Sequence, residues 1–193
     1  THGHEDHIGA MPFLLREFNL PVFGTSFTIE LLKEKLKEHD LLQDARLQKV
    51  KPGEISEFGP FKLEYIRVNH SIPEGVGLAI ETPEGIVVHS GDFRMDQTPV
   101  DGQATDLLRF AHYGERGVLA LLSDSTNVEK EGFTLSEREV ARTLEALMGV
   151  SKGRVIVAVF ASNITLIHQV VHLASRFHRK IHFSGKSMRT NVR

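Results

Sequence analysis

The hydrophobic and polar positions of this chain follow two different periods. Short β-rich runs are separated by longer stretches in which apolar residues recur every three or four positions, a pattern typical of α/β proteins. The short runs predict strands at Pro21–Gly24, Arg46–Val50, Lys62–Val68, Val76–Glu81, Gly85–Ser90, Val118–Ser123, Arg154–Phe160 and Lys180–Phe183. The longer stretches predict helices at His7–Phe18, Ser26–His39, Ser136–Met148 and Asn163–Phe177. The fold class expected from this pattern is α/β.

The arrangement of the predicted elements changes near residue 105. Before that point the strands follow one another through short turns, such as the one at residues 82–85, where Pro and Gly supply the turn geometry. After it, strands and helices alternate as in a βαβ layer. We therefore expect two domain segments, residues 1–105 and 106–193, with a boundary near residues 103–117.

The composition excludes several classes of protein and of site. Hydrophobic residues make up 40% and charged residues 25% of the 193 residues, as in an ordinary globular protein. No run approaches the roughly 20 apolar residues of a membrane-spanning helix, so we expect no membrane association. The chain has no cysteine, so any metal must be held by histidine and carboxylate side chains. The net charge of −2 argues against uniform coating by nucleic acid but is compatible with a local basic patch.

The first seven residues, THGHEDH, concentrate side chains that bind metals. His2 and His4 are two positions apart, so in an extended segment both imidazoles project to the same side. Asp6 and His7 follow where the chain turns into a predicted helix, and this second pair can face a neighbouring ion. A solvated polar loop is the alternative, and it would be preferred for a lone His-x-His. Four ligand-type residues in six positions favour a metal site, and their spacing favours two ions.

Two later residues are candidates for the remaining ligands. His70 follows the predicted strand Lys62–Val68 and precedes a turn, where a side chain can reach the rim of a sheet. Asp92 follows the apolar run 86–88 and Gly91, which permits close approach of the backbone. Alone, His70 would be interpreted as a surface or core histidine and Asp92 as a turn residue. Together with the opening motif, both are predicted metal ligands.

These motifs resemble those of a known family. HGHEDH, then His70, then the Asp92 of SGDF resemble the successive metal-ligand motifs of the metallo-β-lactamase fold. The stretches DFRMDQTPVDG, LLSDSTN and VFASN are similar to the β-CASP nucleases, most closely to the ribonuclease J family. The resemblance implies a partial metallo-β-lactamase αββα sandwich followed by part of an α/β β-CASP domain. It also implies an internal segment of a longer enzyme, inactive alone, because the family's last metal-binding histidine would lie beyond residue 193.

The resemblance implies a role for each motif. It implies two zinc ions, or manganese, with the ligands His2, His4 and His70 for the first, Asp6 and His7 for the second, and Asp92 bridging them. A bridging water would be the nucleophile, and Asp6 would help to position or deprotonate it.

Asp124 matches an acid that lies near the site in the family; the alternative interpretation is a strand-end acid that caps a turn. Phe160, Ala161 and Ser162 match part of an RNA-binding pocket. The chain departs from the family after VFASN, where Thr165 and Leu166 replace a usual His-Arg pair.

Three hypotheses for the function follow. The leading one is a metal-dependent ribonuclease that cleaves single-stranded RNA internally and from the 5′ end, in RNA maturation and decay. The family further implies a cytoplasmic location and a homo-oligomer, dimer or tetramer, of the full-length protein. The second hypothesis is a hydrolase of small esters, thioesters or lactams with the same fold. The third is a non-catalytic scaffold within an RNA-processing complex, which is disfavoured because every ligand position within the chain is filled.

Overall fold

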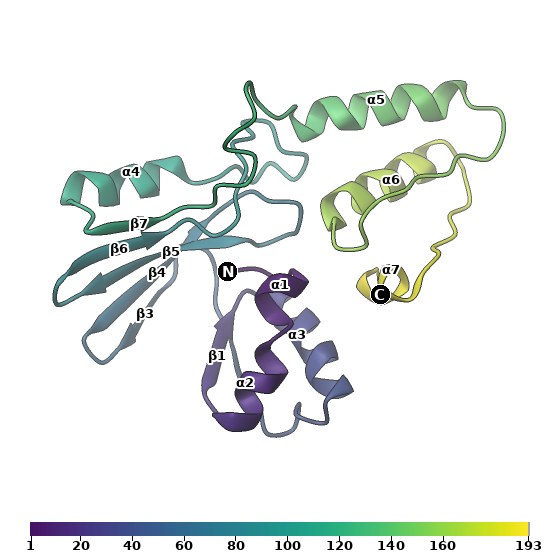
Figure 1. The fold of residues 1–193 in the computed structure, drawn as a ribbon. Helices are drawn as coiled ribbons and strands as arrows, with labels where there is room; N and C mark the ends of the chain where they lie inside the picture. The colour runs from purple at the N-terminus through teal and green to yellow at the C-terminus, as the bar shows by residue number, and fades with distance from the viewer. Residues whose placement is uncertain (193) are drawn as a thin grey trace.

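The computed structural model describes residues 1–192 and has the mixed α/β character expected (Figure 1). The helices are α1 (Glu5–Ile8), α2 (Met11–Glu17), α3 (Ser26–Glu38), α4 (Leu107–Arg116), α5 (Glu137–Val150), α6 (Ile164–Arg176) and α7 (Lys186–Asn191). The strands are β1 (Pro21–Gly24), β2 (Arg46–Lys49), β3 (Ile55–Phe58), β4 (Phe61–Arg67), β5 (Val76–Thr82), β6 (Gly85–His89) and β7 (Ala120–Leu122). Within residues 1–192, no helix combines the length and apolar character needed to cross a membrane.

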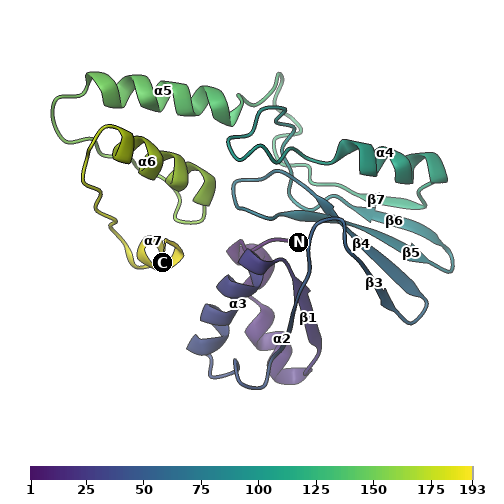
Figure 2. The ribbon, with the colours of Figure 1, turned by 180° about the vertical axis from the view of Figure 1, so that it is seen from behind.

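The first part of the chain forms four layers. Strands β3 to β7 make one sheet in sequence order, antiparallel except for the parallel pair β6 and β7. Helix α4 covers one face of this sheet, and the parallel pair β1 and β2 lies against the other face, with α2 and α3 outside it (Figures 1 and 2). This order of helix, sheet, sheet and helix confirms the partial αββα sandwich that the family resemblance implied.

Side chains that alternate along the strands of the central sheet form one apolar core on each face of the sheet. Ile66, Ala79 and Val88 point to one face and pack against Tyr113 of α4. On the opposite face Tyr65 belongs to a second core that meets the small sheet. The period of two along each strand therefore explains why both faces are apolar.

A third apolar cluster anchors the segment that carries the opening motif. Leu32 and Leu36 of α3 are almost fully buried, and they pack against Ile8 of α1 and Leu15 of α2. Because Ile8 follows the motif directly, this packing fixes where the motif lies relative to the sandwich.

The helix predicted over His7–Phe18 is wrong in detail, because the chain forms two helices there. Helix α1 ends at Ile8 and α2 begins at Met11, with Gly9 and Ala10 between them. Pro12 lacks an N–H group, and its ring would clash with the carbonyl of Ile8 in a continuous helix. Proline is tolerated in a first helical turn, which is where α2 holds it.

The second part of the chain contains fewer strands than expected. The predicted strands Arg154–Phe160 and Lys180–Phe183 are wrong: both segments lack strand pairing among residues 1–192. Residues 155–160 keep the alternating exposure of a strand, but the residues that the structure describes include no neighbouring strand to supply hydrogen-bond partners. The elements here are α5 and α6, which pack on each other, and the short α7.

Three elements were not predicted from the sequence, namely β3, α4 and α7. Helix α4 and strand β7 follow the expected boundary at residue 105, yet α4 packs on the central sheet and β7 pairs with β6. The layers built by the first part therefore extend to Leu122.

A buried carboxylate ties α4 to the sheet. Glu64 of β4 is 3% exposed; it accepts hydrogen bonds from both Arg109, with Nη2 at 2.7 Å, and the Tyr113 hydroxyl, at 2.6 Å. Burial raises the pKa of Glu64, but the hydrogen bonds from these two side chains outweigh it, so the net pKa is lowered. Burial, followed by the bond to Glu64, raises the pKa of Tyr113 to about 12, which keeps the hydroxyl protonated as a donor.

We expect the substitution Tyr113→Phe to lower the free energy of unfolding by about 2 kcal/mol, because a buried ionised carboxylate loses a donor. Urea unfolding of the full-length protein at neutral pH measures the change. The matched control is Tyr65→Phe, since the Tyr65 hydroxyl is buried without a hydrogen-bond partner within residues 1–192. Equal destabilisation by both substitutions would contradict the role given to Glu64.

Candidate metal centre

The opening motif lies against the end of the central sheet. The carbonyl of Thr1 accepts a hydrogen bond from the N–H of Val76, the first residue of β5, at 3.0 Å. This contact holds the extended residues before α1 beside the strand, and His2 becomes almost fully buried, with 1% exposed. The histidine is therefore held at the rim of the sheet, where loops following other strands also end.

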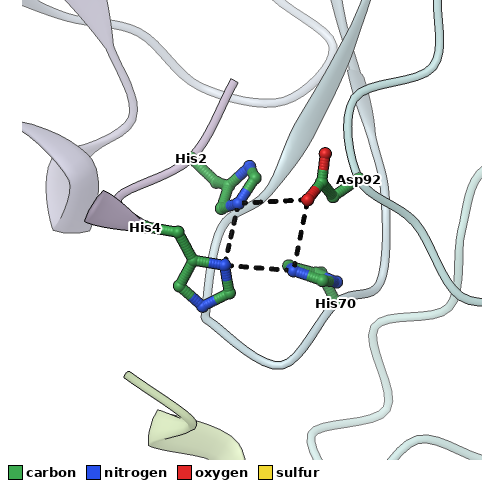
Figure 3. A group of neighbouring side chains, drawn as sticks. All are labelled: His2, His4, His70 and Asp92. Atoms are coloured by element: carbon green, nitrogen blue, oxygen red, sulfur yellow. Dashed lines mark hydrogen bonds and ion pairs between the residues drawn. The ribbon is translucent and has the colours of Figure 1, made fainter. Parts of the chain in front are cut away.

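Four side chains from three segments meet at this rim (Figure 3). The Nδ1 atom of His4 lies 3.0 Å from His2 Nε2 and 3.2 Å from His70 Nε2. Asp92 Oδ2 lies 3.8 Å from His2 Nε2 and 3.9 Å from His70 Nε2. One ligand atom from each of the four lies within 4.8 Å of the others, which is close enough for one ion to contact them all.

A second group adjoins the first and shares Asp92 with it. The Nε2 atom of His7 lies 3.4 Å from Asp92 Oδ1 and 3.7 Å from Asp6 Oδ2. Both Asp6 and His7 come from α1, which begins at Glu5. Asp92 thus directs one carboxylate oxygen toward each group, an arrangement that suits a carboxylate bridging two ions.

Two histidines of the first group, His2 and His70, are in the neutral state that a metal requires. Burial first, and then the charges that neighbouring histidines would carry, together lower the pKa of His2 to about 2. Burial also lowers the pKa of His70 to about 4, with His4 adding to the effect and Asp92 opposing it. Neutral imidazoles offer lone pairs at neutral pH, so the donor set fits divalent metal ions such as zinc or manganese.

Residues outside the two groups support these ligands, and sequence reasoning missed Thr1 among them. The hydroxyl of Thr1 lies 3.2 Å from His2 Nδ1 and 3.3 Å from His7 Nδ1, on the side of each ring opposite the ligand atom. Gly91 adopts a φ of 62°, and a Cβ there would lie 2.6 Å from the Val76 carbonyl oxygen. Its N–H donates to His89 Nδ1 at 3.0 Å. The sequence predicted the close backbone approach at Gly91 but gave no signal for Thr1.

Asp124 contacts the residue that follows Asp92 but belongs to neither ligand group. Its carboxylate accepts hydrogen bonds from the N–H groups of Thr126 at 2.8 Å and Phe93 at 3.4 Å. Its own N–H donates to the Ser90 hydroxyl at 2.8 Å. Burial raises the pKa of Asp124, but these hydrogen bonds outweigh it and the net pKa is lowered. Asp124 therefore contacts the chain on both sides of Gly91 and Asp92, through its N–H on the Ser90 side and through its carboxylate on the Phe93 side.

The residues expected to bind RNA line a groove next to the first group. Phe160, Ala161 and Ser162 form one wall, and α1, α3 and α7 contribute the others around a volume of about 1250 Å³. The Phe160 ring is 84% exposed. The carbonyl oxygen of Ser162 lies 3.3 Å from His4 Nε2, so the groove reaches the ligand cluster.

Known ribonucleases resemble the whole of this chain. Ribonuclease J of Helicobacter pylori is 45% identical over 194 residues, which cover 100% of this chain and 28% of that protein. Ribonuclease J of Synechocystis is 45% identical over 190 residues, 97% of this chain and 30% of that protein. Ribonuclease J of Thermus thermophilus is 43% identical over 195 residues, which cover 97% of this chain and 34% of that protein. The chain thus spans about three tenths of the length of the curated relatives it matches.

A solved structure shares the fold. A protein of unknown function from Enterococcus faecalis superimposes with a TM-score of 0.61 at 15% identity, covering 86% of this chain and 47% of that one. The model of the ribonuclease J β-CASP domain matches residues 152–193. The model of the metallo-β-lactamase superfamily matches residues 1–128, a span that contains all six residues of the two ligand groups. With this match over most of its length, the chain belongs to the metallo-β-lactamase superfamily.

Proposed function

We propose that this chain carries the metal centre of a ribonuclease that hydrolyses phosphodiester bonds of single-stranded RNA. The observation that carries the proposal is the shared Asp92, whose two oxygens face two separate groups of ligand-type side chains. Enzymes that hydrolyse phosphodiesters use paired ions about 3.5–4 Å apart in this way. The similarity to ribonuclease J across the whole chain supports RNA as the substrate.

The chain's own residues would prepare the site for this reaction. When bound, two divalent ions supply Lewis-acid chemistry: they make water a nucleophile at neutral pH and neutralise charge on the reacting phosphate. The ligands would be His2, His4 and His70 in one group, Asp6 and His7 in the other, and Asp92 in both. The Asp6 side chain is 78% exposed beside His7, so its Oδ2 can orient an attacking water or accept its proton.

The groove supports binding of a single-stranded nucleic acid. Exposed aromatic rings stack on bases of any sequence, and Phe160 offers such a ring. We propose that cleavage occurs both inside the RNA and from the 5′ end, in RNA maturation and decay in the cytoplasm. Zinc is the proposed metal with manganese as the alternative, and the full-length protein is proposed to be a dimer or tetramer. The comparisons do not favour a hydrolase of small esters, thioesters or lactams.

The first prediction concerns Asp92. We expect Asp92→Ala in the full-length protein to lose metal from both groups and to leave a 5′-monophosphorylated, 3′-labelled RNA uncut. His7→Ala should lose only about one of two ions, because the first group keeps its four members. Metal analysis after gel filtration and a product ladder measure the two effects.

The controls for these substitutions are Asp44→Ala and His112→Ala, which remove the same side-chain types from exposed positions outside both groups. Both should keep full metal content and cleavage. Intact RNA after incubation with fully metal-loaded, unsubstituted protein would refute the nuclease function.

A second prediction separates Asp124 from the ligands. We expect Asp124→Asn to retain both metal ions but to lower kcat about 10–100-fold, the usual cost of losing a residue that orients a metal ligand. The amide removes charge beside Asp92 and weakens the hydrogen bonds from Phe93 and Thr126. Single-turnover cleavage and metal analysis measure the effects. An unchanged kcat would contradict a role in orienting Asp92 and would show that Asp124 only caps a turn.

A third prediction concerns the groove. We expect Phe160→Ala to weaken RNA binding about 10–100-fold, since stacking contributes about 1–3 kcal/mol per base. Stability should not change, because the ring is 84% exposed. Titration of fluorescent single-stranded RNA gives the dissociation constant. The matched control is Phe133→Ala, whose ring is 91% exposed and outside the groove, and an equal loss for both would speak against the groove.

A further inference from the structure

The ring of His4 joins the two parts of the chain. Its Nδ1 atom faces His2 and His70 inside the ligand cluster (Figure 3). Its Nε2 atom faces the other way, 3.3 Å from the carbonyl oxygen of Ser162 and 3.5 Å from the hydroxyl of Ser71. A carbonyl oxygen can only accept, so this contact requires the proton on Nε2 and leaves the Nδ1 lone pair free toward the cluster.

The carbonyl of Ser162 is held in place from several directions. It also accepts the N–H of Ile164 at 2.9 Å. The preceding carbonyl, of Ala161, accepts from the side chain of Asn191 in α7 at 2.8 Å. Asn163 caps α6 by accepting the Leu166 N–H at 3.1 Å. The loop before α6 is therefore a fixed acceptor for His4.

One backbone hydrogen bond connects the start of α6 to the loop that follows His70. The N–H of Thr165, in the first turn of α6, donates to the carbonyl of Ser71 at 3.3 Å. Ser71 directly follows His70, a member of the cluster. An N–H in the first turn has no partner inside its own helix, so this bond is available for docking without any cost to α6.

We propose that α6 and its preceding loop act as a positioning element for the metal centre: they fix the tautomer and orientation of His4. The proposal rests on the proposed metal site. In this proposal Ser162, which is 158 positions from His4 in the sequence, contributes to the affinity of the first group for its ion. The second group receives no such support, because Asp6 and His7 belong to α1 and His7 Nδ1 faces Thr1.

The test compares Thr165→Pro with Thr165→Ala in the full-length protein. Proline removes the N–H that docks α6 and is tolerated in a first helical turn, whereas alanine keeps the N–H and removes only the side chain. Both substitutions are made in a His7→Ala background, where only the first group remains, and in a His70→Ala background, where only the Asp6–His7–Asp92 group remains complete. Zinc affinity is measured by competition with a chelator.

We expect Thr165→Pro to weaken zinc binding at the first group about 10–100-fold and to leave the second group unchanged, as losing the partner of a ligating histidine does. Thr165→Ala should bind as tightly as the parent. The nitrogen NMR spectrum of the histidine rings gives a second readout. His4 should keep its proton on Nε2 in the Thr165→Ala variant and should show a mixture of tautomers in the Thr165→Pro variant.

Ser71→Ala tests the same ring without altering any helix. It removes the second acceptor near His4 Nε2, and we expect a weakening of a few-fold at the first group alone. Zinc affinities equal to the parent for both Thr165→Pro and Ser71→Ala would overturn the proposal. A loss of equal size at both groups would also overturn it, since docking would then support the whole fold. Absence of zinc binding in the parent protein would instead refute the proposed metal centre itself.

Discussion

The carboxylate of Asp92 is the group on which the site depends. Among residues 1–192 it is the one acid that belongs to both groups of ligand-type side chains, and it lies within 3.9 Å of an imidazole nitrogen of His2, His7 and His70. Burial disfavours a charge on His2, and neighbouring imidazoles would repel it when they are charged. Both effects lower the pKa of His2 and keep its ring neutral. Neutral imidazoles grouped around a carboxylate are a donor set that fits a cation. The fold around it serves to bring these groups together and keep them there.

The αββα layers explain how three separate segments reach one point. The opening motif is held along β5 by Thr1, His70 follows β4, and Asp92 follows β6. These strands are neighbours in the central sheet, so the segments beside them meet at one rim. Cores on both faces of the sheet fix the strands, and the Glu64 network holds α4 over one of them. The precision of the site is thus a consequence of packing far from it.

The second part of the chain contributes to the same rim in two ways. It provides one wall of the groove through Phe160, and it supplies the acceptor that faces the outer nitrogen of His4. If the proposed roles hold, a loop that contacts both the groove and His4 couples RNA binding to metal binding, because a shift of the loop changes the orientation of the imidazole. By linkage, the coupling acts in both directions.

The sequence by itself determined what local physics controls. Period and turn residues predicted β1, β4, β5 and β6 almost to their ends, and the spacing of His2 and His4 predicted imidazoles on one side. The absence of cysteine limited the donors to histidine and carboxylate. Local reasoning failed where the outcome depends on a neighbour: residues 154–160 have the pattern of a strand, but the described part of the chain places no strand beside them. It also missed the stop that Pro12 imposes on a helix.

Only the tertiary structure decided which of the candidates meet. Three features depend on contacts between residues far apart in sequence. Asp92 turns one oxygen toward each group, α4 lies on the central sheet, and Ser162 faces His4. Such contacts follow from how whole layers pack, and neither periodicity nor spacing encodes them one segment at a time. The sequence therefore named the ligand types, and the packing of the layers determined their geometry.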